Sequence, residues 1–420
     1  MNKPRADLLI HGAAELITCS ETAGDPLGRI PGGAVAVSAG KILATGRREV
    51  LEKSIDFSGA ELIDASGRIV APGFVDCHTH LVFGKSRVKE YAMKMTRTAE
   101  EIEAEGLTTG IPASIVMTRE TGEEELFSAA LDRLKRMLRH GTTTVESKSG
   151  YGITWSDEHK MLLVNRRLAE SQPVEVVSTF LGAHDFPPEI DRSDESQRTQ
   201  YIDQLTREMI PRVAEEHLAE FCDVYCDTGY YTAAEAETVL RAGMDNGLLP
   251  RIHTDAYANI GGSTLAADLP AVTADHLNYP SPREMTRMAD SGVIGVVLPA
   301  LDFAVSHPDP FDARALIGSG MTLALGTNLN PGNWTESMQI VMQLACRVHR
   351  MSPEEAMLAA TVGAARAIRR SDRIGRLAEG YQADIQIWGL PTFEDIVYRI
   401  GTNGVWRVIK NGEIVVRRDE

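Results

Sequence analysis

The sequence is poor in cysteine, and the few cysteines form no recognisable pattern. The 420 residues include five, an odd number, widely spaced and without a Cys-x-x-Cys pair: Cys19, Cys77, Cys222, Cys226 and Cys346. This distribution predicts no disulfide framework and favours a cytoplasmic location, where thiols stay reduced. We expect Cys222 and Cys226, which lie beside a strand-like run, to be core residues.

Long apolar runs and excess positive charge are missing as well. No apolar stretch approaches the roughly 18 residues of a membrane span, so neither a transmembrane helix nor a signal peptide is expected. The 43 basic and 59 acidic residues give a formal net charge of −16, which would repel phosphate groups. We therefore expect no nucleic-acid partner and no membrane partner, whereas a small anionic substrate can still be held by local arginine or histidine side chains.

Two histidines at the end of an apolar segment are the first functional signal. The stretch Ala71-Pro-Gly-Phe-Val-Asp-Cys-His-Thr-His80 places His78 and His80 two residues apart. Side chains in a β-strand alternate between its faces, so both imidazoles project to the same side. Such a pair is half of a divalent metal site, which needs one or two further ligands from elsewhere in the chain.

Both ends of the chain show a sequence pattern that is typical of short β-strands joined by turns. Short apolar runs alternate with glycines at the N-terminus, and the last 50 or so residues repeat this pattern. Asn411-Gly412 between two apolar runs predicts a type I′ hairpin. We predict that residues 1–70 and 365–420 form one small β domain, which is completed only when the two ends of the chain meet.

The intervening residues 71–364 show strands alternating with longer helices, which is typical of a parallel sheet with crossover helices. Residues 123–140, for example, have apolar side chains at helical spacing and are followed by the strand-like Thr142-Thr-Thr-Val-Glu. Counting from residues 69–76, with a second strand placed at residues 111–117, we expect eight strands and hence a (β/α)8 TIM-type barrel. Chemistry in such barrels takes place where the strands end at their carboxyl side.

Polar or metal-binding side chains follow most of the expected strands. They are His78 and His80, Lys148-Ser-Gly-Tyr-Gly152, His184, His253, His276 and Thr327-Asn-Leu-Asn-Pro-Gly332. A cation on His78, His80 and His253 would acidify a water, producing hydroxide that can attack a planar amide or amidine carbon. A neutral His276 can polarise an oxygen or shuttle protons, and Arg87 can bind a carboxylate through two hydrogen bonds.

These motifs resemble the amidohydrolase superfamily and, within it, the imidazolonepropionase family. The similarity covers nearly the whole chain. It rests on Pro72-Gly-Phe-Val-Asp-Cys-His-Thr-His-Leu-Val-Phe-Gly84, Glu146-Ser-Lys-Ser-Gly-Tyr-Gly152, Leu181-Gly-Ala-His184, Gly261-Gly262, Ala274-Asp-His-Leu277 and Asn330-Pro-Gly332. The first motif is general to the superfamily, whereas Lys-Ser-Gly-Tyr-Gly and Leu-Gly-Ala-His are specific to the narrower family.

The resemblance implies a barrel flanked by a β-sandwich built from both termini, one divalent ion, zinc or iron, and a homodimer. It implies hydrolysis of a five-membered cyclic amide that carries a propionate, namely the opening of 4-imidazolone-5-propanoate to N-formimidoyl-glutamate in histidine degradation. It assigns the metal to His78, His80 and His253, the substrate to Arg87, Tyr151, His184 and Asn330, and the catalytic step to His276. Relatives with two metals carry a lysine at the fourth strand end. The Leu181–His184 motif, assigned to that strand, has none.

This chain departs from the family pattern in three places. Asn328 stands where the superfamily has an aspartate after the eighth strand, and an amide cannot take a proton from water, although its oxygen can touch a metal. The run His253-Thr-Asp-Ala256 lacks the family's glutamate or glutamine, leaving Asp255 as the candidate carboxylate. The lid tyrosine expected near residue 100 is also missing. We predict that His276 or Asp255 accepts the proton, with Asn328 at the reacting centre.

Several functions fit this pattern. The chain can be an imidazolonepropionase whose base was replaced naturally or by an engineered Asp→Asn substitution. It can also be a divergent enzyme acting on a 2-thioxo or 2-oxo imidazolidinone propionate, either a desulfhydrase that releases sulfide or a hydantoin-type hydrolase. A ring deaminase that releases ammonia is a further alternative, which the fold supports but Lys148-Ser-Gly-Tyr-Gly152 does not. A non-catalytic scaffold would need none of the histidines, so their presence argues against that role. Neither the metal nor the ring is fixed by the sequence, because imidazole binds several first-row ions.

Overall fold

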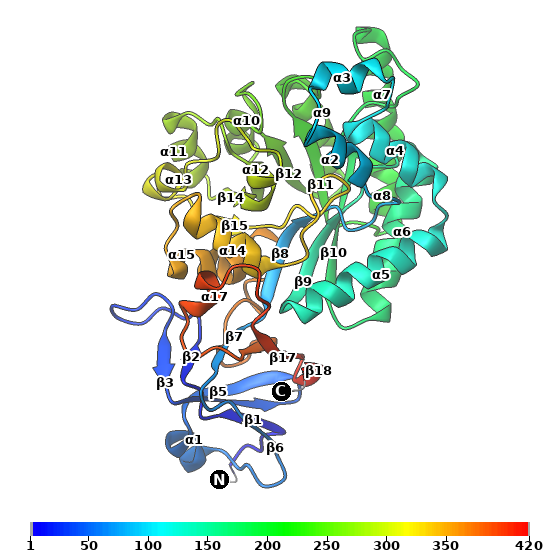
Figure 1. Ribbon diagram of the computed structural model, residues 1–420. Coiled ribbons are helices and arrows are strands. Elements are labelled where there is room, and N and C mark those ends of the chain that lie inside the picture. Colours follow the sequence, from blue (N-terminus) through cyan, green and yellow to red (C-terminus); the bar gives the residue numbers. More distant parts are fainter. Residues whose placement is uncertain (1–2, 419–420) are drawn as a thin grey trace.

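The computed structural model describes residues 3–418, apart from the side chains of Ala99 and Glu103. Figure 1 shows a barrel surrounded by helices and, beneath it, a smaller β region in which both termini lie. None of the helices in the described residues is long and apolar enough to cross a membrane. All five cysteines are free thiols, and Cys222 and Cys226 are buried in the core as predicted.

The barrel is an eight-stranded parallel sheet in the order β15-β14-β13-β12-β11-β10-β9-β8, and its last strand contacts its first. Its strands are β8 (Phe74–Thr79), β9 (Thr142–Lys148), β10 (Glu175–Ala183), β11 (Phe221–Cys226), β12 (Leu249–Thr254), β13 (Thr273–His276), β14 (Ile294–Val297) and β15 (Leu323–Leu325). All eight run parallel, so their carboxyl ends meet at one mouth. The predicted (β/α)8 barrel is confirmed.

Helices cover the outside of the barrel, and the long ones among them bury an apolar face. In α5 (Glu123–Arg139) this face holds Leu126, Ala130, Leu134 and Met137, at the predicted spacing. The other principal helices are α6 (Trp155–Ser171), α7 (Glu195–Gln204), η1 (Leu205–Met209), α8 (Ile210–Glu215), α9 (Ala233–Asp245), α10 (Gly262–Asp268), α11 (Pro282–Asp290), α12 (Pro299–Ala304), α13 (Ala313–Gly318), α14 (Met338–Arg347), α15 (Pro353–Leu358), η2 (Ala359–Gly363), α16 (Ala364–Ala367) and α17 (Asp395–Tyr398).

The prediction of a second barrel strand at residues 111–117 is wrong, because this segment belongs to helix α4 (Gly110–Glu120). Its buried residues Ser114, Ile115 and Thr118 recur at helical spacing and form one face. Helices α2 (Val88–Lys94) and α3 (Ala99–Ala104) precede it. The second strand is therefore β9, His184 follows the third strand, and the fourth strand is β11. That strand also lacks a lysine.

Strands from both ends of the chain form two small sheets, one of N-terminal strands alone and one that joins both ends. One has the order β5-β4-β1-β6 and the other β18-β17-β16-β7-β2-β3. Their strands are β1 (Leu8–His11), β2 (Glu15–Ile17), β3 (Arg29–Pro31), β4 (Gly33–Ser38), β5 (Lys41–Arg47), β6 (Glu61–Asp64), β7 (Ile69–Pro72), β16 (Ile385–Trp388), β17 (Val405–Lys410) and β18 (Glu413–Arg417). Because β16 pairs with β7, the two ends meet in one sheet. The predicted hairpin turn is present, with positive φ at Asn411 and Gly412.

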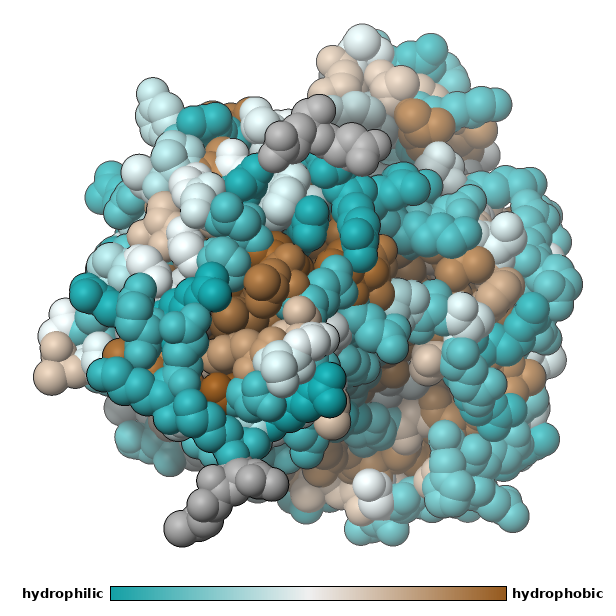
Figure 2. Space-filling model, turned by 90° about the horizontal axis from the view of Figure 1, so that it is seen from below, coloured by the Kyte–Doolittle hydropathy of each residue, from teal (hydrophilic) through white to brown (hydrophobic). Residues whose placement is uncertain are grey.

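The two small sheets pack face to face around an apolar layer. Ile10 and Val35 from the first sheet and Val70, Ile385 and Ile409 from the second belong to one buried cluster. Helix α1 (Arg48–Ser54) covers the other face of the first sheet. Figure 2 views the molecule from this end and shows hydrophobic surface near the centre, framed by hydrophilic residues.

Candidate metal centre and substrate cavity

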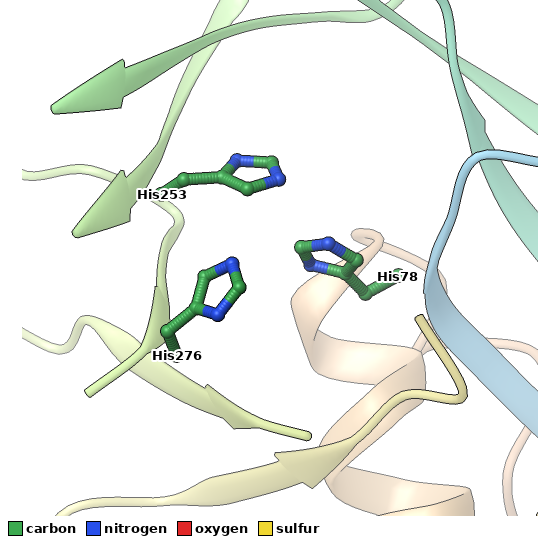
Figure 3. A group of neighbouring side chains, drawn as sticks. All are labelled: His78, His253 and His276. Carbon is green, nitrogen blue, oxygen red and sulfur yellow. The ribbon is translucent and has the colours of Figure 1, made fainter. Parts of the chain in front are cut away.

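Three histidines from different strands meet at the mouth of the barrel. His78 comes from β8, His253 from β12 and His276 from the end of β13, and Figure 3 shows their rings turned toward one another. Each offers one ring nitrogen that lies within 4.8 Å of those of the other two, and all three side chains are buried. Divalent metal ions are bound by such converging imidazoles.

His80, predicted as a ligand beside His78 and His253, is also buried at this place. Its ring centroid lies 5.7 Å from that of His78 and 5.8 Å from that of His253. The ring stacks on His184 at 4.8 Å, and its Nδ1 is buried without a hydrogen-bond partner among the described residues. The structure therefore gathers the rings of all three predicted ligands. Among the described residues, however, the histidines whose ring nitrogens lie within 4.8 Å of one another are His78, His253 and His276, without His80.

Buried carboxylates fix two of these imidazoles. His78 Nδ1 lies 2.6 Å from Asp275 Oδ2, and His253 Nδ1 lies 3.0 Å from Asp223 Oδ1. An Nδ1–H that donates to a carboxylate leaves Nε2 with a free lone pair, which is the arrangement common around metal-binding histidines. Both Nε2 atoms are buried and have no partner within residues 3–418.

The donor set fits a divalent cation. Burial, followed by the charge of Lys148, holds the pKa of His78 and of His253 well below the usual value, so both imidazoles are neutral and able to bind metal. Asn328 Oδ1 is a further buried oxygen for which the described residues provide no partner. Orphaned polar atoms of this kind are costly when nothing binds them, so a cation that satisfies them would stabilise the site.

Beneath the histidines lies a buried network of charges that the sequence did not reveal. Lys148, in the strand that leads to Tyr151, points into the barrel, where its Nζ contacts Glu146 Oε1 at 2.9 Å and Asp223 Oδ2 at 2.8 Å. Arg251 Nη2 lies 3.1 Å from Asp275 Oδ2. All five side chains are fully buried. The sequence feature that could have indicated this network is the presence of charged residues inside otherwise apolar strands.

A cavity of about 580 Å³ opens beside the histidines. Eight of the predicted site residues line it: His80, Arg87, Tyr151, His184, His253, His276, Asn328 and Asn330. Tyr225, Tyr230 and Tyr257 add an aromatic wall that the sequence reasoning missed, and the rings of Tyr225 and Tyr230 stack at 4.2 Å. The cavity thus offers aromatic faces for a planar ring beside the metal-binding group.

The geometry corrects the prediction that Asp255 accepts a proton. Its backbone is left-handed, with φ 54°, and its carboxylate does not line the cavity. Instead, Oδ1 accepts a hydrogen bond from Thr254 Oγ1 at 2.9 Å, and Oδ2 accepts one from Ser263 Oγ at 2.6 Å. Burial raises the pKa of Asp255 to about 6, but both oxygens are already engaged. His276 is left as the predicted proton acceptor at the cavity.

Asn330 borders the cavity, but its amide mainly shapes the loop after β15. Its Oδ1 accepts hydrogen bonds from the backbone of Gly332 at 2.8 Å and Asn333 at 2.9 Å, while Nδ2 donates to the Asn328 carbonyl at 2.8 Å. The predicted substrate contact is therefore not the principal use of this side chain. The loop that it holds presents Asn328 to the histidines.

Arg87 lies at the start of α2, on the wall of the cavity. Its Nη1 is 3.4 Å from Glu90 Oε1, a carboxylate that also accepts hydrogen bonds from Lys94 and from the backbone of Gly110. The buried Nε has no partner among the described residues. The guanidinium therefore has donors to spare for a ligand carboxylate.

His184 is expected to make the stability of the metal-free protein depend on pH. Burial lowers its pKa from 6.5 to about 4, and its Nδ1 donates to the Gly150 carbonyl at 3.0 Å. The unfolded chain takes up a proton near pH 6.5, whereas the folded chain resists until about pH 4, so the free energy of unfolding falls as the pH drops between these values. The loss is about 3 kcal/mol for this residue. Urea unfolding from pH 7.5 to 4.5 measures it, and His184→Gln should flatten the slope.

Comparison with known proteins agrees with this architecture. A model of the amidohydrolase family matches residues 69–415, and the chain belongs to that family. It is 43% identical to an imidazolonepropionase of Geobacillus thermodenitrificans, over 97% of this chain and 98% of the relative. The imidazolonepropionase of Streptococcus gordonii is 39% identical, over 91% of this chain and 90% of that relative. The chain is an imidazolonepropionase-like hydrolase that acts on C–N bonds in cyclic amides.

Solved structures with lower sequence similarity share the fold. An adenosine deaminase from Xanthomonas campestris with bound zinc superposes with a TM-score of 0.73 at 19% identity, covering 99% of this chain and 94% of that one. Escherichia coli guanine deaminase gives a TM-score of 0.73 at 14% identity, covering 98% and 99%. At these identities the likeness supports the barrel architecture alone.

Proposed function

We propose that this enzyme opens the ring of 4-imidazolone-5-propanoate to give N-formimidoyl-glutamate, as its resemblance to imidazolonepropionases suggests. The observation that carries the proposal is the pair of unpartnered Nε2 atoms of His78 and His253, anchored through Nδ1 on buried carboxylates, beside a cavity that Arg87 also lines. This arrangement supports a site where a metal centre and a carboxylate-binding group serve one small anionic substrate.

His78, His80 and His253 would hold one divalent cation, zinc or iron, with Asn328 Oδ1 beside them. A bound cation supplies Lewis acidity, which acidifies water and polarises an amide carbonyl. Arg87 would bind the propionate, and Tyr151 and His184 would position the ring against the aromatic wall. His80 and His184 stack in one layer along the cavity, so displacement of either ring would disturb both the metal and the substrate positions.

His276 is the proposed proton acceptor. Among the described residues, Glu90 is the one carboxylate on the cavity wall, and Arg87 and Lys94 already engage it. Burial lowers the pKa of His276 to about 4, so its imidazole is neutral at pH 7 and can accept a proton. It can then deliver this proton to the leaving ring nitrogen.

Further features of the proposal follow from the family resemblance. The barrel, residues 71–364, would act as the catalytic domain, and residues 1–70 and 365–420 would form a separate β-sandwich domain. The pairing of β16 with β7 supports this division, because it joins the two chain ends. We also propose a homodimer in the cytoplasm.

The test is to incubate zinc- or iron-loaded protein with 4-imidazolone-5-propanoate and, separately, with its 2-thioxo and 2-oxo ring analogues. Ring absorbance, sulfide and ammonia are followed together. We expect loss of imidazolone without sulfide or ammonia, and formation of N-formimidoyl-glutamate. Turnover of an analogue alone would instead assign the chain to a different ring substrate.

The variant Asn328→Asp makes this test more specific, because it places a carboxylate on the cavity wall that His253 and His276 also line, where the family pattern has an aspartate. A correctly placed general base raises the rate of such a reaction by about 10²-fold or more. Because His276 is already proposed to accept the proton, we expect Asn328→Asp to raise the rate of imidazolone hydrolysis by only about 10-fold. Asn246→Asp, at the exposed end of helix α9, is the control for an added carboxylate and should give no gain. If Asn328→Asp abolished the activity, the asparagine would belong to another chemistry.

A further inference from the structure

Lys148 is a buried ammonium for which the proposed reaction has no use. Its Nζ lies 2.8 Å from Asp223 Oδ2, 2.9 Å from Glu146 Oε1 and 3.8 Å from Asp275 Oδ2. Burial and Arg251 lower the pKa of Lys148, but the three carboxylates outweigh them and raise it overall. The side chain is therefore a cation inside the barrel.

Two of these carboxylates are the supports of the metal-binding histidines. Asp223 uses Oδ2 for Lys148 and Oδ1 for His253, whereas Asp275 Oδ2 is shared by His78, Arg251 and, at a longer distance, Lys148. The lysine comes from β9, the carboxylates from β11 and β13, and the histidines from β12 and β8. One ammonium thus links the supports of two histidines that stand on separate strands.

We propose that Lys148 is a positioning residue of the metal centre, which orients His78 and His253 by holding Asp275 and Asp223 in place. This inference rests on the proposed function, in which His78, His80 and His253 bind a divalent cation. When the carboxylates are fixed, each Nδ1–H has a single acceptor, and each Nε2 keeps the direction seen in Figure 3. Partners behind metal-binding histidines typically change metal affinity 10- to 100-fold when they are removed.

Packing alone does not explain a lysine at this position. An uncharged side chain of similar length would fill the space without the large desolvation cost of a buried ammonium. What lysine adds is three N–H donors, enough to reach carboxylates on several strands at once. Glu146 completes the group, since its other oxygen, Oε2, accepts a hydrogen bond from the Thr79 backbone at 3.3 Å, between His78 and His80.

The experiment compares Lys148→Met with the double variant Lys148→Met/Glu146→Gln. The single variant leaves an uncompensated negative charge, which can impair folding. The double variant removes one charge of each sign and so keeps the charge balance of the cluster. Each protein is loaded with Co²⁺, and the dissociation constant, the visible spectrum and the rate of metal removal by EDTA are measured, with thermal unfolding alongside. Lys410→Met is the matched control, because Lys410 forms a buried ion pair with Asp384 at 2.6 Å in the small β sheets.

We expect both Lys148 variants to bind Co²⁺ 10- to 100-fold more weakly, to lose it faster to EDTA and to show an altered spectrum. Lys410→Met should match the wild type in all three metal readouts, even where its unfolding temperature falls. A folded double variant with wild-type Co²⁺ affinity and spectrum would overturn the inference, while leaving the proposed function standing. A wild-type protein that bound no Co²⁺ would overturn the proposed metal site itself, and this inference with it.

Discussion

Replacing His253 by alanine is expected to abolish binding of the divalent metal and to lower kcat/KM for the cyclic amide by about 10³-fold or more. The imidazole is buried, its Nδ1 is fixed by Asp223, and its Nε2 faces His78. Lewis-acid stabilisation by a metal contributes several kcal/mol to such a reaction, and about 4 kcal/mol corresponds to three orders of magnitude in rate. The loss should therefore appear in metal content and in rate together.

Metal analysis of the purified protein and steady-state kinetics measure these two effects. His159→Ala is the matched control, since His159 lies on the outer helix α6 and pairs with Glu216. His276→Ala separates the roles of the histidines: as a proton acceptor it should lose activity while it keeps the metal. If His276→Ala lost the metal and His80→Ala retained it, the ligand set would be His78, His253 and His276 instead.

Replacing Arg87 by alanine should weaken binding of a carboxylate substrate by about 2 to 4 kcal/mol, the scale for breaking a buried charge pair. This corresponds to a rise in KM of about 30- to 1,000-fold. The guanidinium lies on the cavity wall with an unpartnered Nε, and Glu90 holds it from one side. A substrate analogue in which a neutral amide replaces the carboxylate should be affected little, because it forms no charge pair.

A second variant tests the same group without removing it. The Cβ of an alanine at position 332 would lie 1.8 Å from Arg87 Nη2, so Gly332→Ala must displace the guanidinium and should also raise KM. Gly318→Ala, where nothing lies within 4 Å of the new Cβ, is the matched control. Lys94→Ala should have a smaller effect, because its ammonium is about half exposed and interacts with Glu90. Unchanged KM in Arg87→Ala would remove this residue from the site.

Much of the fold was predictable because it follows local rules. Short apolar runs between helical patterns indicated the barrel strands, and helical spacing indicated the helices between them. Asn411-Gly412 adopts the positive φ values that its hairpin requires. The prediction of a strand at residues 111–117 was wrong because a short apolar run fits a strand and a buried helix face equally well.

The positions of the histidines in the candidate site were also predictable from the sequence, whereas the roles of Asp255 and Asn330 were not. His78, His80, His253 and His276 follow strand ends, and parallel strands in a closed barrel bring those ends together. Asp255 is not expected to accept the proton, because its carboxylate accepts hydrogen bonds from Thr254 and Ser263 and does not line the cavity, which no spacing rule predicts. Asn330 shows the same limit, since hydrogen bonds within its own loop occupy its amide.

The sequence by itself determined the barrel, the β structure at both ends and the histidines at the mouth, because periodicity and strand direction are properties of neighbouring residues. Only the tertiary structure decided which polar groups support those histidines. Lys148, Asp223, Asp275 and Arg251 come from four separate strands, and they meet because the barrel closes. Buried charges must find partners wherever the fold brings them, so their pairing is a property of the closed barrel and not of any one segment.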